Sequence, residues 1–152
     1  MALPMSNKPA TVDITALAQY MDKVSELASV SKMMGAVYLR DFIEGQDVAG
    51  ELLARAVQAD IRAKSRLEEA EAIAYLDRAS DYLKTRNLKD TSEARKMYMC
   101  IDDDVKQAQD TKAKTEALVA LMKNKLSILR QAHDDLKKIL YGDQYMTPYE
   151  GM

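Results

Sequence analysis

The sequence predicts an all-α protein made of long antiparallel helices with heptad packing. The first sign is a row of positions that alternate three and four residues apart, the spacing of a helix face packed on another helix. The second sign is composition, because 5 glycines and 3 prolines among 152 residues leave few turn residues for a sheet. The row consists of Val105, Ala108, Lys112, Thr115, Val119, Met122, Leu126, Leu129, His133, Leu136 and Leu140.

The N-terminal part is expected to form an arm followed by one helix. Residues 1–12 hold two prolines and no apolar periodicity, so they are predicted to be a flexible arm. Asp13 is a favourable N-cap, and the three-four spacing resumes after it. Residues 29–31 are a plausible break in this helix, and Gly45 is expected to end it.

The middle of the chain predicts a second helix, a loop and a short helix. The second helix is expected to begin at the cap Asp47 and to end near Leu83. Residues 84–91 are the clearest loop, because polar residues interrupt a helical composition there. Asp90, followed three residues later by Glu93, resembles a capping box for the short helix that follows.

One long final helix and a tail complete the predicted architecture. Three aspartates, residues 102–104, stand where a helix N-terminus favours anions, and Gly142 is expected to end this helix. Residues 13–142 are therefore predicted to be a single helical domain. Residues 143–152 are predicted to be a tyrosine-containing tail.

The residue inventory argues against an enzyme. His133 is the one histidine and Cys100 the one cysteine, so neither a metal site nor a catalytic set is predicted, and no cofactor is expected. His133 stands on the heptad row, where a polar residue commonly fixes register. Burial is expected for Cys100. A net charge of −2 excludes a uniformly basic protein, and no apolar run is long enough to span a membrane, so a cytoplasmic protein is expected.

One basic stretch stands out between residues 78 and 96. It holds six cations against three acids, with Tyr82 inside it and Tyr98 just beyond. Positive charge beside aromatic rings is the combination that follows a phosphate backbone and stacks on bases. The candidate DNA-binding residues are Arg78, Tyr82, Lys84, Arg86, Lys89, Arg95 and Lys96. A solvated surface without a ligand is the alternative interpretation.

Residues 78–142 also resemble the phage recombination mediator family of the UvsY type. The resemblance rests on the basic, tyrosine-containing helix end RASDYLKTR, a loop, and the acidic turn YMCIDDDV that leads into one long helix. It implies a homo-oligomer that binds single-stranded DNA and helps to load a recombinase past single-strand-binding protein. Within this likeness, Arg78, Lys84 and Arg86 match the basic positions before the loop.

The sequence therefore leads to two functional hypotheses. The first is a non-catalytic recombination mediator of the host cytoplasm that binds single-stranded DNA, itself, and a recombinase or single-strand-binding protein. The second is a structural or adaptor protein, such as a virion component or an inhibitor of a host complex, that acts only through protein contacts. Self-association is expected through the heptad row at Val119, Met122, Leu126, Leu129, His133, Leu136 and Leu140.

Overall fold

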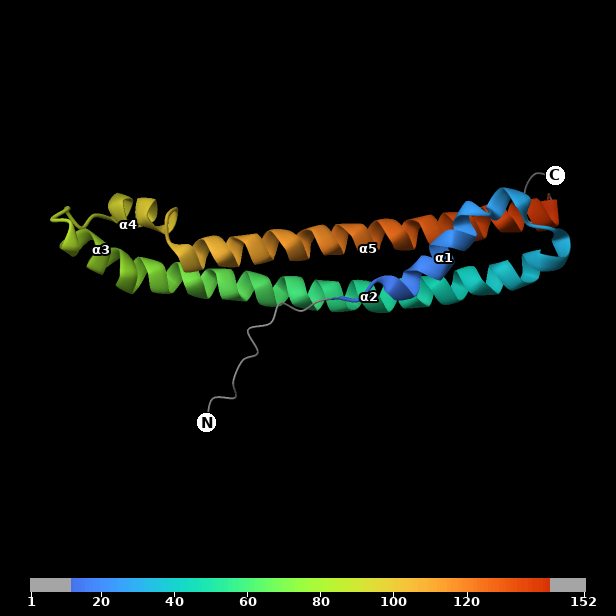
Figure 1. Ribbon diagram of the computed structural model, residues 1–152, viewed down its shortest axis with the longest axis horizontal. Coiled ribbons are helices and arrows are strands. Elements are labelled where there is room, and N and C mark those ends of the chain that lie inside the picture. Colours follow the sequence, from blue (N-terminus) through green and yellow to red (C-terminus); the bar gives the residue numbers. More distant parts are fainter. Residues whose placement is uncertain (1–11, 143–152) are drawn as a thin grey trace, which may run out of the picture. The chain divides into compact units, whose positions relative to one another are not determined.

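The computed structural model describes residues 12–142, and all regular structure within that range is helical (Figure 1). The all-α prediction is thereby confirmed, while the predicted tail and all but the last residue of the predicted arm lie outside the described residues. The elements in chain order are α1 (Thr15–Ser25), the 3-10 turn η1 (Leu27–Ser29), α2 (Lys32–Ile73), the π-helical turn η2 (Ala74–Arg78), α3 (Ala79–Thr85), α4 (Ser92–Met99) and α5 (Asp103–Tyr141).

The described chain divides into two compact units. Residues 56–119 form the hairpin unit, and residues 12–55 together with 120–142 form the three-helix unit. Helices α2 and α5 each contribute residues to both units. The two units each have their own internal contacts, which favours two domains, whereas the shared helices favour one. The prediction of a single domain therefore stays a prediction.

In the three-helix unit, a local polar contact starts α1 and a short turn ends it. The Asp13 carboxylate accepts hydrogen bonds from the Thr15 backbone amide at 2.9 Å and from the Thr15 hydroxyl at 2.6 Å. After η1, Val30 adopts an extended conformation, and the chain re-enters a helix at α2. The break expected at residues 29–31 is therefore confirmed, and it separates two helices.

The predicted helix end at Gly45 and the predicted cap at Asp47 are both wrong, because α2 runs through these positions. Gly45 is buried, and a Cβ atom built on it would lie 2.9 Å from Cγ of Tyr20 in α1. The glycine thus permits close approach of α1 to α2, and the packing outweighs its poor helix propensity. Lys23 of α1 forms an ion pair with the buried Asp41 of α2 nearby.

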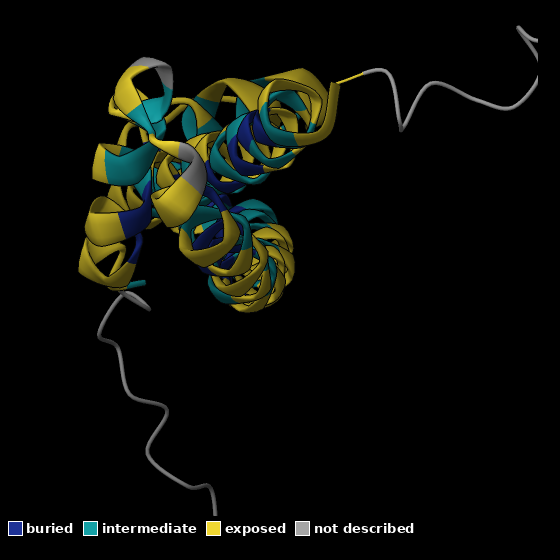
Figure 2. Ribbon diagram, turned by 90° about the vertical axis from the view of Figure 1, so that its right-hand side faces the viewer, coloured by how far each residue is buried: buried dark blue, intermediate teal, exposed yellow. Residues whose placement is uncertain are grey.

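The apolar core of the three-helix unit lies between its helices (Figure 2). Its four largest fully buried side chains are Phe42 of α2 and Met122, Leu129 and Leu136 of α5. Leu140 packs so closely on Gly35 that a Cβ atom there would meet its side chain at 2.4 Å. The start of α2 therefore lies against the end of α5.

In the hairpin unit, α2 and α5 run antiparallel. Asp60 of α2 accepts hydrogen bonds from Lys112 at 2.9 Å and from Thr115 at 2.7 Å, whereas the later Arg78 pairs with the earlier Asp102. The Thr115 hydroxyl, followed by the Lys112 ammonium, lowers the pKa of Asp60. Lys112 and Thr115, two of the polar residues of the heptad row, thus find a charged partner in the same chain.

Helix ends in the hairpin unit mostly follow the predicted pattern. Asn87 has a φ of 54° in the turn that follows α3, so the predicted loop is confirmed, except that its first two residues belong to α3. The capping box at Asp90 is wrong, because the Thr91 hydroxyl caps α4 by accepting from the Ala94 amide at 3.1 Å. Asp102 caps α5 by accepting from the Val105 amide at 3.0 Å, as expected of an acidic N-terminus.

The heptad row of α5 faces the interior of its own chain. Every member is buried or half-buried, with Val105 at 1% exposure and Met122, Leu129 and Leu136 at 0%. His133 is half-buried, with Nδ1 3.4 Å from a carboxylate oxygen of Asp134, and its role in register stays a prediction. The row is thus at least partly covered within the chain, and self-association through it stays a prediction.

Two glycines of α2 provide a direct test of these packing assignments. A Cβ atom at Gly50 would meet nothing within 4 Å, so Gly50→Ala should stabilise the protein by about 1 kcal/mol through helix propensity. Gly45→Ala should instead destabilise it by about 1–3 kcal/mol, because the Tyr20 ring must shift. Urea denaturation followed by circular dichroism measures both, and equal effects of the two substitutions would contradict the assigned role of Gly45.

Candidate nucleic-acid interface

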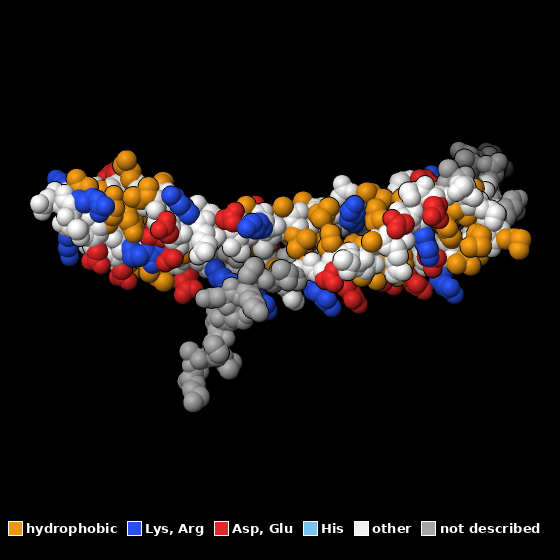
Figure 3. All heavy atoms as spheres, viewed as in Figure 1, with side chains coloured by type: hydrophobic (Ala, Val, Ile, Leu, Met, Phe, Trp, Pro, Cys, Tyr) orange, Lys and Arg blue, Asp and Glu red, His pale blue; other side chains and the backbone are white. Residues whose placement is uncertain are grey.

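The basic stretch of the sequence lies at the end of the hairpin unit, where η2, α3 and α4 meet. Side chains of α4 join it to η2: Arg95 donates to the backbone carbonyl of Tyr75 at 3.0 Å, and the Tyr75 hydroxyl lies 3.3 Å from that of Ser92. At this end of the unit, Lys and Arg side chains lie beside hydrophobic ones (Figure 3). The fold thus gathers the predicted residues into one region.

Arg78 is bound by acids of its own chain. Its guanidinium donates two hydrogen bonds to the carboxylate of Asp102, at 2.7 and 2.8 Å, and also lies 3.3 Å from Asp104. Asp102 is 3% exposed and accepts a further hydrogen bond from the Tyr98 hydroxyl at 2.8 Å. The bonds from Arg78 hold the pKa of Asp102 well below its usual range, although burial alone would raise it. Arg78 therefore has an internal structural role.

Arg95 is the second cation that the fold engages internally. Its guanidinium donates to both carboxylate oxygens of Asp90, at 2.6 and 2.7 Å. The hydrogen bond from Arg95 is the main cause that lowers the pKa of Asp90. Since a bidentate pair holds both partners in a fixed geometry, Arg95 stabilises the loop before α4.

Four predicted cations remain exposed at this end of the hairpin unit. Within residues 12–142, no carboxylate forms an ion pair with any of them. The stretch from residue 78 to residue 96 holds six cations and three acids. Two of the cations, both arginines, and one of the acids, Asp90, take part in the ion pairs described above, so four cations and two acids of the stretch lie outside these pairs. We call these four residues the cation cluster: Lys84, Arg86, Lys89 and Lys96.

A tyrosine pair supports one member of the cation cluster. The Arg86 guanidinium lies over the Tyr82 ring, 3.8 Å from its centroid, and the Tyr82 and Tyr98 rings lie 5.0 Å apart at 45°. Arg86 covers one side of Tyr82 while Tyr98 packs against the same ring, so the exposed planar group of this stack is the guanidinium. Bases stack on arginine planes as well as on aromatic rings.

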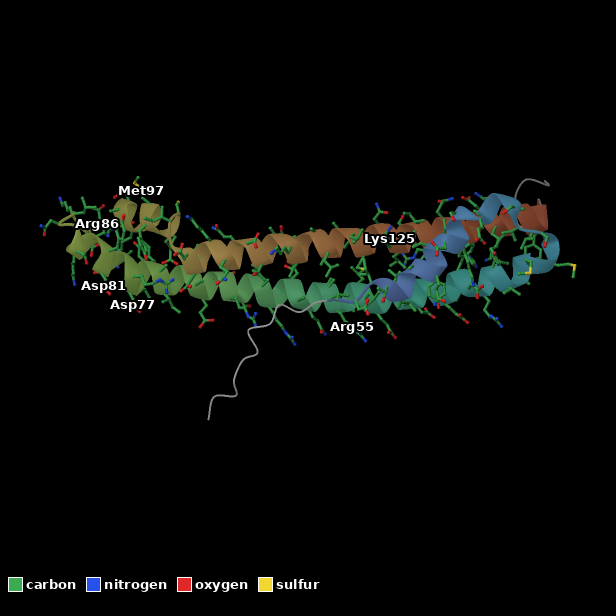
Figure 4. All side chains as sticks on the ribbon, in the orientation of Figure 1. Arg55, Asp77, Asp81, Arg86, Met97 and Lys125 are labelled. Atoms are coloured by element: carbon green, nitrogen blue, oxygen red, sulfur yellow. The ribbon has the colours of Figure 1, made fainter. Side chains whose placement is uncertain are left out.

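Met97 and two of the acidic side chains lie on different sides of this end. Arg86 lies at the turn, and Met97 lies on the side opposite Asp77 and Asp81 (Figure 4). Met97 is 73% exposed, and Leu88 and Ile101 are also exposed. The sequence did not single out Leu88 or Ile101, because neither residue belongs to a row with heptad spacing.

Other candidate groups offer no further chemistry among the described residues. Cys100 is exposed, so its expected burial is wrong; it follows the last residue of α4, and its thiol lies 3.7 Å from the Lys96 carbonyl. In the part of the chain that the structure describes, no three His, Cys, Asp or Glu side chains are grouped to hold a metal ion. None of the helices within residues 12–142 is long and apolar enough to cross a membrane.

Comparison with known proteins gives no relative from which a role could be transferred. No protein-family model, curated protein or solved structure matches the chain. The role of this region is therefore inferred from its own residues.

The ion pair of Arg78 with the buried Asp102 predicts a specific stability change. Asp102→Ala should lower the free energy of unfolding by about 3 kcal/mol at pH 7, because it removes a helix cap and leaves Arg78 without its main partner. Asp104→Ala should cost at most about 1 kcal/mol, because the Asp104 side chain is 68% exposed. Urea denaturation measures both, and equal losses would contradict the role of Asp102.

The same pair predicts how this difference changes with pH. Since the folded pKa of Asp102 lies below the unfolded value of about 3.9, its contribution is complete above that value and declines as pH falls below it. The gap between wild type and Asp102→Asn in unfolding free energy should therefore narrow from pH 5 to about pH 2. A gap that stays constant over this interval would show that the carboxylate charge is not what stabilises the fold.

Proposed function

We propose that the protein binds single-stranded DNA through the cation cluster, without catalysis and with little preference for base sequence. One observation carries the proposal: four exposed cations form no ion pair with a carboxylate of the described chain, and one of them is a guanidinium stacked on a tyrosine pair. The resemblance of residues 78–142 to recombination mediators supports the same interpretation. A recombinase or a single-strand-binding protein is the corresponding candidate protein partner.

The proposed binding mode divides the work between lysines and arginine. Lys84, Lys89 and Lys96 contact phosphates as mobile point charges, and each contact releases counterions. The outer face of Arg86 provides a plane on which a base can stack, because the tyrosine pair holds the guanidinium in place. Single-stranded DNA suits this arrangement better than a duplex, whose bases are already stacked on one another.

A second candidate is an adaptor that acts through protein contacts alone. The exposure of Met97, Leu88 and Ile101 favours it, since exposed apolar side chains commonly mark contact surfaces. Such a surface would bind its partner with little dependence on salt, whereas phosphate contacts are strongly salt-dependent. The two proposals therefore predict different salt titrations.

The lysines and the arginine should affect DNA binding in different ways. Replacing Lys84, Lys89 and Lys96 by Ala should reduce the slope of log affinity against log salt by about 2, at roughly 0.7 for each phosphate that is no longer neutralised. Arg86→Lys should leave the slope unchanged but weaken binding about fivefold or more, because the charge remains while the stacking plane is removed. Fluorescence anisotropy with a labelled oligonucleotide measures both quantities.

A matched control separates the cluster from general charge. Arg55, Lys123 and Arg130 are exposed residues of the three-helix unit, and replacing them by Ala removes the same charge from elsewhere. This control should bind DNA with the wild-type slope. If the wild-type protein does not retain single-stranded DNA even at low salt, or if control and cluster variants behave alike, the DNA proposal fails and the adaptor becomes the better interpretation.

A further inference from the structure

The hairpin unit contains an open groove of about 690 Å³ between α2 and α5. Four of its twelve lining residues have small side chains, namely Ala63 and Ala70 on α2 and Ala108 and Thr111 on α5. Ile73 also lines the groove and is 41% exposed. The groove therefore combines small residues that permit close helix approach with one exposed apolar side chain.

Two charged residues that line the groove, one of each sign, form no ion pair in the described part of the chain. Three cations and three acids line it, and the chain itself pairs Arg78 with Asp104 and Lys114 with Asp110. No ion pair or hydrogen bond within residues 12–142 engages the side chains of Arg66 and Glu69. The groove is thus electrically neutral overall and presents one positive and one negative group from the same helix.

The two units differ in how their long helices are covered. In the three-helix unit, α1 packs on α2 through Tyr20 and Lys23. In the hairpin unit, the described chain places no third helix in the groove lined by residues 63–73 of α2 and 104–114 of α5. In the described part of this unit, the groove is therefore open to a further helix.

We propose that this groove is a self-association surface that receives α2 of a second copy, antiparallel, about a two-fold axis near residue 68. The midpoint between positions 66 and 69 lies near residue 68, and so does the midpoint between positions 63 and 73. One axis therefore places Arg66 opposite Glu69 of the second copy and Ile73 over the small Ala63, and repeats both contacts by symmetry. The proposal concerns the protein alone and does not rest on DNA binding.

Charge favours a second copy over an unrelated partner of one sign. A strongly acidic or basic segment would meet like charges on one side of the neutral groove, and such contacts are costly. A second copy supplies both signs at matching positions. The small side chains allow the helix axes to approach within about 8–10 Å, the usual distance of packed helices.

Charge reversal on one helix gives a test in which two defects should repair each other. The Arg66→Glu chain carries two acids at the contact, and the Glu69→Arg chain carries two cations. Each variant alone should self-associate about tenfold or more weakly than the wild type, because like charges then face each other. An equimolar mixture of the two variants should associate again, as should the double variant Arg66→Glu, Glu69→Arg. Sedimentation velocity over a concentration series, without DNA, measures these states.

Controls keep this test decisive. Arg62→Glu and Glu68→Arg reverse charges at exposed positions of α2 that do not line the groove, and both should associate like the wild type. Ile73→Asn should weaken association without a charge change, which covers the case that a reversal variant fails to fold, as judged by circular dichroism. A monomeric wild type, single variants that associate normally, or a mixture that stays monomeric would each overturn the proposal.

Discussion

The burial of one side of α5 is the constraint on which the rest of the structure depends. A helix of this length is not stable alone in water, so its apolar residues must be covered by other helices. Met122, Leu129 and Leu136 are covered completely in the three-helix unit, and Val105 is covered at the other end of the helix. Because the chain covers this side itself, the remaining surfaces are available for other molecules.

Polar groups set the pairing of α2 with α5 in the hairpin unit, where much of the interior is alanine. Alanine contacts are small and similar to one another, so they distinguish poorly between alternative registers. Asp60 has two partners on α5, and Asp102 joins Arg78, Tyr98 and the first turn of α5. A shift by one residue would leave these charges without partners, which costs far more than moving an alanine. Charged contacts therefore define the register here.

The sequence predicted the elements whose signals are local. The heptad spacing of α5, the loop after α3 and the acidic cap of α5 depend on residues close together in the chain. Gly45 was misinterpreted because a glycine looks the same whether it ends a helix or admits a neighbouring ring. The partners of Arg78 and Arg95 were missed because a list of charges does not show which of them meet in the fold. The sequence alone therefore did not divide the six cations of the basic stretch into two that the fold pairs and four that it leaves exposed.

The π-helical turn η2 affects which side of α3 faces the interior of the hairpin unit. Ala74, Ala79 and Leu83 are all buried, and the first two are five residues apart, one more than an α-helix allows for the same face. The wider turn absorbs one additional residue, which would otherwise rotate everything after it by about 100°. A chain one residue shorter at this point could run as an uninterrupted α-helix and still present α3 in the same orientation. The turn thus makes the direction of the basic end independent of a one-residue difference in length.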